Sequence, residues 1–287
     1  MSIVNECLVV NLQLGIWTGQ RLDKEASRKV TEEANADSDA ARVNKHLIPK
    51  ESMKPIVTAA NSIRTHFYSN TLPWKDNGDR VISRAAFFRF IEEHERLVGS
   101  FQNEVQKFGD EGYPSAVEKA GFRMGDLHNP DDYPSPAEVK RRFYVNLDID
   151  PVTEAADFRV QMDAKQTEAI KASMERAMNE RVGRAMASVW ERLGDVLGNF
   201  AERTKTGSGI RVELVENLRE IVNILPELNI TNDPQLEVIR RQIEAKLTGY
   251  EASELRQDDT ARSVAARDAQ KIMDQMRGFM TAFGAAA

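Results

Sequence analysis

The chain has 287 residues, of which 41% are hydrophobic, so it holds enough apolar material for a buried core, and its length favours two lobes. Its 45 acidic residues outnumber its 39 Lys and Arg residues, and the net charge of −6 argues against a generally basic nucleic-acid coat protein. A single cysteine, Cys7, excludes an internal disulfide and is expected in a reducing compartment.

The N-terminal sequence MSIVNECLVVNLQLGIW has no basic segment before its apolar run and no small-residue cleavage site after it, so we expect no secretory signal. The longest uncharged stretch, residues 7–20, is too short for a transmembrane helix. We therefore expect no membrane partner and a cytoplasmic location.

Residues 8–16 alternate apolar and polar side chains, with Leu8, Val10 and Leu12 on one face, and this period of two predicts a strand. Residues 142–150 repeat the pattern and predict a second strand that ends at Pro151. Two shorter segments, residues 80–83 and 157–162, are candidates for additional strands. In the second strand the predicted inward side chains are Phe143, Val145, Leu147 and Ile149.

Helices are predicted between these strands. Residues 21–44 are charged and alanine-rich, so any helix there is expected to lie on the surface. Residues 49–68 and residues 83–108 each carry an apolar face with helical spacing, and the Asn77-Gly78 pair between them predicts a tight turn. The prolines that follow indicate an irregular stretch with a short helix at residues 115–121.

Residues 163–205 contain no proline and repeat apolar residues every three or four positions, which predicts one helix about 60 Å long. A helix of that length projects from a small domain, crosses a neighbour or pairs with another chain. Further helices are predicted at residues 212–225, where Pro226 stops the helix, at residues 233–249, and at residues 252–283 with a break near Asp258. The residues predicted to mediate assembly, called the assembly stripe below, are Ile170, Met174, Val182, Val189, Leu193 and Phe200.

Together these elements predict an α+β fold that is predominantly helical. A small antiparallel or mixed sheet lobe at residues 1–162 is expected to precede a long antiparallel helical hairpin or bundle at residues 163–287.

Several segments of the chain resemble domain-of-unknown-function family 3150 of bacteriophages and prophages; they are WTGQRLDKEAS, FYSNTLPWKDNGDRVISRAAFFRF, and DYPSPAEVKRRFYVNLDIDPV followed by DFRV. The resemblance covers roughly residues 5–250. Genes of that family often lie near genes for a MoxR-type AAA+ ATPase and a von Willebrand factor A-like protein. The resemblance therefore implies a phage or mobile-element context and a possible AAA+ ATPase partner, and it implies no biochemical activity.

Pro130, Asp131, Glu138 and Lys140 superficially match the residues of restriction-like nucleases, in which two carboxylates hold Mg²⁺ beside a lysine. The spacing does not suit that site, because further prolines intervene and residues 137–141 resemble a short helix. A proline-rich loop that ends in a helix cap is the favoured interpretation.

Other metal sites are weakly indicated. Asp148 and Asp150 share one strand face, but outward acids are ordinary on a half-exposed strand. The four histidines lack the HxxxH or HExxH spacing of a zinc site, and His94, which lies among glutamates, is interpreted as a helix-surface or boundary residue rather than a ligand. We therefore predict no enzyme activity, no catalytic residue, no cofactor and no metal.

Basic and aromatic residues recur in segments that the sheet is expected to bring together. Lys and Arg neutralise phosphates and exposed rings stack on single-stranded bases, so the cluster is a candidate nucleic-acid patch. The favoured alternative is that most of the rings are core and that the charges are solvated. The predicted patch comprises Arg80, Arg84, Arg89, Lys140, Arg141, Arg142 and Tyr144, with Arg64, His66, Phe67, Tyr68, Trp74, Lys75 and Phe88 as further members.

The favoured hypothesis is a non-enzymatic phage or mobile-element accessory protein that acts through helix-mediated self-assembly as a homo-oligomer and docks a partner such as an AAA+ ATPase. The alternative is a DNA-binding accessory protein for phage replication, recombination or packaging. A metal-dependent hydrolase is the third and least favoured hypothesis.

Overall fold

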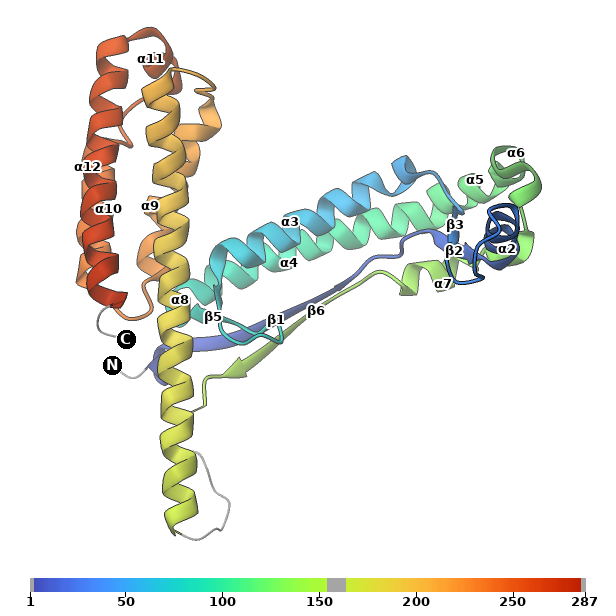
Figure 1. Ribbon diagram of the computed structural model, residues 1–287, viewed down its shortest axis with the longest axis horizontal. Coiled ribbons are helices and arrows are strands. Elements are labelled where there is room, and N and C mark those ends of the chain that lie inside the picture. The colour runs from blue at the N-terminus through green and yellow to red at the C-terminus, as the bar shows by residue number, and fades with distance from the viewer. Residues whose placement is uncertain (1–2, 154–163, 285–287) are drawn as a thin grey trace. The chain divides into compact units, whose positions relative to one another are not determined.

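The computed structural model describes residues 3–153 and 164–284, whose helices and strands are drawn in Figure 1. The fold is α+β and predominantly helical, as predicted, and the described residues form a four-stranded and a two-stranded sheet. By their contacts they divide into two compact units. The predicted boundary between residues 162 and 163 and the predicted strand at residues 157–162 lie outside the described residues. The bundle unit consists of Met1–Asn11, Asn70–Phe90 and Asp148–Ala287, and the helix-pair unit consists of Leu12–Ser69 and Ile91–Leu147.

The larger sheet has the strand order β4-β5-β1-β6. β5 pairs antiparallel with both β4 and β1, and Cys7 lies opposite Ser83 in the second pairing. Gly78 has a φ of 93°, which confirms the tight turn predicted between β4 and β5. The bounds are β1 (Cys7–Gly15), β4 (Leu72–Pro73), β5 (Arg80–Ser83) and β6 (Tyr144–Pro151), and the short helix α1 (Ile3–Glu6) precedes β1.

Two details of the predicted strands were wrong. In β1, Cys7 and Val9 join the core of the bundle unit while Val10 is also buried and Leu8 is only half-buried, so the start of the strand is covered on both faces. In β6, Ile149 is 45% exposed although the alternation placed it inward. β6 is an edge strand, so among the described strands its side chains have a strand neighbour on one side only.

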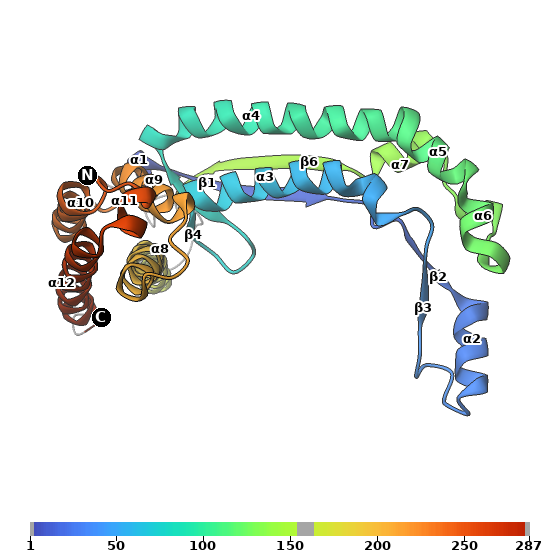
Figure 2. The same ribbon diagram turned by 90° about the horizontal axis from the view of Figure 1, so that it is seen from above.

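The helix-pair unit is built around the helices α3 and α4, which lie side by side in Figures 1 and 2. Ile56, Ile63 and Phe101 contribute to one hydrophobic cluster that also contains Trp17 and Tyr113, whose rings meet edge to face at 5.6 Å. The bounds are α3 (Lys54–Asn70), which follows the 3-10 turn η1 (Lys50–Met53), α4 (Arg84–Lys107), the π-helical turn η2 (Phe108–Gly112), α5 (Tyr113–Glu118), α6 (Ala120–Met124), the 3-10 turns η3 (Gly125–Leu127) and η4 (Pro130–Asp132), and α7 (Pro136–Arg141).

Residues 21–44, where any helix was expected to lie on the surface, form a strand, a helix and a strand. β2 (Gln20–Asp23) and β3 (Val43–His46) form the antiparallel two-stranded sheet, and α2 (Lys24–Glu33) connects them. Asp23 stops the strand and starts the helix, because its carboxylate accepts a hydrogen bond from the Ala26 backbone at 2.9 Å. These strands are short and polar, so they leave no alternating apolar pattern in the sequence.

His94, expected at the surface or the boundary of its helix, is 4% exposed and is therefore a buried residue of α4. It lies four residues after the buried Phe90, on the same face of the helix. Burial lowers the pKa of the His94 imidazole, so the neutral form is favoured there.

The bundle unit contains the long helix α8 with the shorter helices that follow it. The reversal after α8 uses Gly207 and Gly209, both with positive φ, and Asp233 caps α10 by accepting from the Gln235 backbone at 2.8 Å. The predicted break at Asp258 is confirmed, since the Asp258 carboxylate accepts hydrogen bonds from the Thr260 and Ala261 backbone at the start of the next helix. The bounds are α8 (Ala164–Thr206), α9 (Val212–Leu228), α10 (Pro234–Lys246), α11 (Ala252–Gln257) and α12 (Asp259–Gly284).

One helix of the bundle continues past its predicted end. α9 includes Pro226, whose missing N–H removes a single hydrogen bond in the last turn, and the helix ends at Leu228. Leu225 and Leu228 are both buried, so packing of this last turn favours the helix.

Candidate functional site

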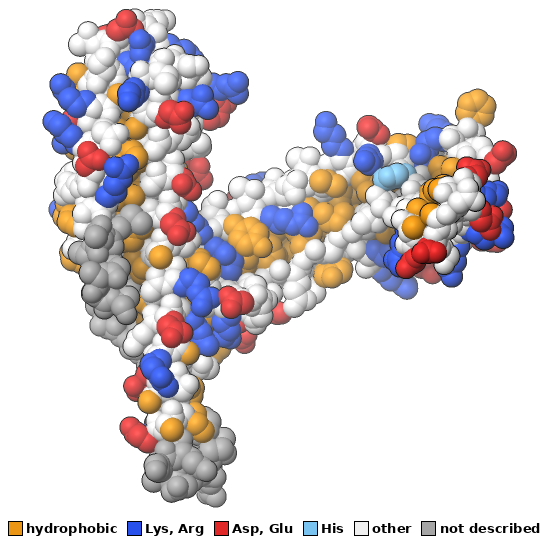
Figure 3. Space-filling view, in the orientation of Figure 1, with side chains coloured by type: hydrophobic (Ala, Val, Ile, Leu, Met, Phe, Trp, Pro, Cys, Tyr) orange, Lys and Arg blue, Asp and Glu red, His pale blue; other side chains and the backbone are white. Residues whose placement is uncertain are grey.

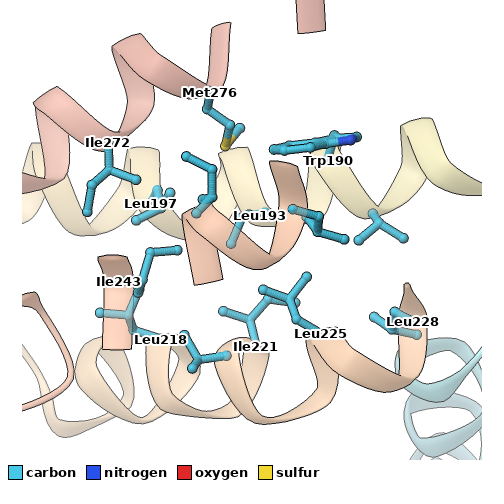
Figure 4. Close-up of a cluster of buried hydrophobic side chains, with 14 of the residues drawn as sticks. Trp190, Leu193, Leu197, Leu218, Ile221, Leu225, Leu228, Ile243, Ile272 and Met276 are labelled. Atoms are coloured by element: carbon cyan, nitrogen blue, oxygen red, sulfur yellow. The ribbon is translucent and has the colours of Figure 1, made fainter. Parts of the chain in front are cut away.

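The C-terminal half of α8 belongs to the core of the bundle unit. Val189, Leu193 and Phe200 are each 0% exposed and lie in one cluster with side chains of α9, α10 and α12, part of which Figure 4 shows. These members of the assembly stripe are therefore structural, because side chains enclosed by the chain's own helices offer no surface to a second molecule.

The N-terminal half of α8 leaves that core, and residues 167–184 are called the α8 arm below. Ile170 and Met174 are half-buried and join no core cluster of the described residues, whereas Val182 packs against the edge of the bundle core. Their spacing of four residues keeps Ile170 and Met174 on one side of the helix. Figure 1 shows the arm extending beyond α9 and α12. The assembly stripe thus divides into a core part and an arm part.

Charged side chains of both signs are interspersed along the arm, as Figure 3 shows. Two copies of such a helix do not repel one another as two helices of a single sign do. The acids of the arm are Glu168, Glu175 and Glu180, and its bases are Lys171, Arg176, Arg181 and Arg184.

The β4–β5 hairpin contacts α8 where the arm leaves the core. Arg184 Nη1 lies 2.7 Å from Asp76 Oδ1, and Arg192 Nη2 donates to the Thr71 carbonyl at 2.8 Å. Arg80 donates to the same carbonyl at 2.7 Å. The exposed Arg184–Asp76 ion pair alone contributes little to stability. The Thr71 carbonyl, which accepts from both Arg80 and Arg192, holds these two guanidinium groups beside the hairpin.

A pocket of about 310 Å³ lies beside this hairpin. Its apolar side is formed by Val9, Trp74 and Val152, which are 7%, 2% and 3% exposed, together with Met178 of the α8 arm. We call it the Trp74 pocket. Its polar lining consists of Lys75, Asp79, Asp150, Thr153 and Arg181.

Two of the pocket's charges are already neutralised by each other. Lys75 Nζ lies 2.9 Å from Asp79 Oδ2, and Asn11 donates to Asp79 Oδ1 at 3.0 Å. Burial opposes ionisation of Asp79, but the hydrogen bonds from Lys75 and Asn11 outweigh it and hold the pKa of this carboxyl below its usual value. By contrast, Asp150 and Arg181 have no hydrogen-bond or ion-pair partner in the described part of the chain.

The first three residues of the predicted nucleic-acid patch lie in the bundle unit and make internal contacts. Arg80 donates to Thr71, Arg84 donates to the Asn5 carbonyl at 2.9 Å, and Arg89 pairs with Glu227 at 2.5 Å. Each guanidinium thus already donates to an acceptor within the protein, which occupies N–H groups that a phosphate would need, and Glu227 also offsets the charge of Arg89.

The other four residues of the predicted patch lie in the helix-pair unit. Lys140 pairs with Asp110 at 2.5 Å, and the Arg142 guanidinium lies 6.0 Å from the centre of the Trp17 ring. Arg141 and Tyr144 remain exposed.

Two aromatic members of the wider cluster cannot stack on bases. Phe67 is 1% exposed and Trp74 is 2% exposed, so these rings are core, as the favoured alternative predicted. Phe88 and Tyr68 are the exposed rings, at 78% and 54%.

The nuclease-like residues do not form a metal site. Glu138 accepts from Ser135 in a capping box at the start of α7, and Lys140 is paired with Asp110. Hydrogen bonds from Ser135 hold the pKa of the Glu138 carboxyl below its usual value. Within residues 3–153 and 164–284, no three His, Cys, Asp or Glu side chains come together as metal ligands would.

A buried charge network in the helix-pair unit was not predicted. Lys45 forms ion pairs with Asp132 and, at 3.2 Å, with Asp23, while Arg21 Nε lies 3.1 Å from the other Asp132 oxygen. The hydrogen bond to Asp132 raises the pKa of the Lys45 ammonium, so this lysine stays protonated and is not a nucleophile. The network joins β3 to η4 and has a structural role. Of these residues only Asp23 has a recognisable sequence pattern, because an Asp directly before a helix is typical of an N-cap.

Comparisons with protein-family models, with curated proteins and with solved structures find no match for this chain. In the part of the chain that the structure describes, no helix combines the length and apolar character needed to cross a bilayer.

Proposed function

We propose that the protein is a non-enzymatic accessory protein of a phage or mobile element that acts through helix-mediated self-assembly and partner docking. The observation that supports this function best is the α8 arm. Its side chains Ile170 and Met174 lie on one side of the helix and are not part of the bundle core that the described residues form. A helix segment with little tertiary packing is only marginally stable in water, so covering this side stabilises both the contact and the helix.

The size of the effect can be bounded from the side chains. Fully burying one Ile or Met contributes about 1.5–3 kcal/mol, and each arm that pairs with another buries both. Because Ile170 and Met174 are already half-buried, only part of this gain remains for an interface. The expected self-association is therefore weak to moderate and depends on protein concentration.

The identity of a second partner rests on the resemblance of the sequence to the phage family. In this proposal the partner is an AAA+ ATPase, and the compartment is the bacterial cytoplasm. The alternative of a DNA-binding accessory protein receives less support, because several bases of the predicted patch are engaged within the protein.

The test is the mass of the full chain measured by light scattering over a range of concentrations. Met174→Glu places a charge on the half-buried side of the arm and is expected to shift the protein toward monomer. Ser173→Glu is the matched control, because Ser173 is exposed on the same turn. A wild-type protein that stays monomeric at about 100 μM, a concentration at which even interactions of about −6 kcal/mol are populated, would overturn the self-assembly proposal.

A further inference from the structure

The Trp74 pocket has features that self-assembly of the α8 arm does not use. Its volume of about 310 Å³ is at the lower end of the range of small-molecule sites, so it suits one amino-acid-sized group and not a nucleotide or larger ligand. Its apolar side is preformed, because Val9, Trp74 and Val152 are buried side chains of the sheet region.

The charges of the pocket select the ligand. Lys75 and Asp79 neutralise each other at 2.9 Å, which leaves Asp150 and Arg181 as the charges of opposite sign that line the pocket without a partner in the described residues. They are also farther apart than an ion pair, since no contact within 4.0 Å joins them. A ligand that carries both signs can pair with each of them at once, whereas a singly charged ligand leaves one charge unpaired.

We propose that the Trp74 pocket binds an amino-acid-sized dipolar group, whose cationic end pairs with Asp150, whose anionic end pairs with Arg181 and whose apolar part packs on Trp74. A free apolar amino acid has this chemistry, and so does an apolar residue flanked by Lys and Asp in a peptide chain. The guanidinium of Arg181 can hold a carboxylate through two hydrogen bonds, and the Thr153 hydroxyl lines the same pocket.

The test uses the full chain and three probes. The probes are L-leucine, the end-blocked tripeptide acetyl-Lys-Leu-Asp-amide, and the uncharged control N-acetyl-leucine amide. Binding is measured by calorimetry and by the chemical shift of the Trp74 indole N–H. We expect saturable binding of at least one charged probe and none of the control. Binding of leucine identifies a free amino acid as the ligand, and binding of the tripeptide alone identifies a peptide segment.

Variants separate the pocket from nonspecific binding. Asp150→Asn and Arg181→Gln are each expected to weaken binding by about tenfold or more, a change typical of losing one charged contact. Arg181→Lys keeps the positive charge and is expected to recover part of the affinity. The matched control is Arg176→Gln, which removes an exposed charge of the same helix away from the pocket.

Two results would overturn the proposal. One is that neither charged probe binds at concentrations up to about 10 mM, which means a binding free energy weaker than about 3 kcal/mol. The other is binding that is unchanged in folded Asp150→Asn and Arg181→Gln proteins. Neither result bears on self-assembly, which is read from the mass of the protein and its Met174→Glu variant.

Discussion

Replacing Leu193 by Ala tests the division of α8 into a core part and an arm part. Leu193 is 0% exposed and lies in the cluster to which α8, α9 and α12 contribute, so the truncation leaves a cavity enclosed by helices (Figure 4). Losing about three methylene equivalents costs about 2.4 kcal/mol in transfer free energy alone. If the neighbouring helices do not close the cavity, the total loss in the free energy of unfolding rises to about 3–5 kcal/mol.

The matched substitution is Met174→Ala on the same helix. Met174 is half-buried and joins no core cluster of the described residues, so we expect its truncation to cost below about 1 kcal/mol in the monomer. Native-state amide exchange of the residues around Trp190 measures the loss of stability in both variants, because this ring lies in the same cluster as Leu193. Equal costs for the two substitutions, or a cost below about 1 kcal/mol for Leu193→Ala, contradict the division.

Three further predictions concern charges and caps. Lys45→Met leaves the buried Asp132 carboxylate without its lysine and is expected to cost about 3–5 kcal/mol, seen as faster amide exchange in β2 and β3; unchanged exchange refutes the structural role of the network. The hydrogen bond from Arg240 lowers the pKa of the Glu237 carboxyl from 4.5 to about 2. The ionised Glu237 therefore stabilises the fold above pH 4.5, and this stabilisation is lost as the pH falls toward 2. Glu237→Gln should flatten the acid unfolding curve in that window, and an unchanged curve contradicts this assignment. Ser135→Ala removes the α7 cap and should cost about 0.5–2 kcal/mol in thermal unfolding, whereas a neutral effect counts against the capping box.

Local chemistry made much of the fold predictable. The Asn77-Gly78 turn, the Asp233-Pro234 start of α10 and the break at Asp258 each depend on side chains that act within a few residues of their own backbone. The apolar period of residues 163–205 likewise identified α8 almost to its ends.

Contacts between distant residues were not predictable in the same way. Lys45 and Asp132 are joined only by the fold, and β2 and β3 are too short and polar to show an alternating pattern. The period of α8 also could not separate Leu193 from Met174, because one apolar stripe serves the chain's own helices over one half and lies outside the core over the other. Periodicity identifies a face of a helix, and the tertiary packing determines what covers it.

Amide hydrogen exchange of the α8 arm at low and at high protein concentration tests directly whether the arms of separate molecules pair. If the arms of separate molecules pair, exchange at residues 167–184 slows as the concentration rises, while exchange at residues 185–200 stays the same. Exchange in the arm that does not depend on concentration, together with a monomeric mass, contradicts self-assembly through the α8 arm.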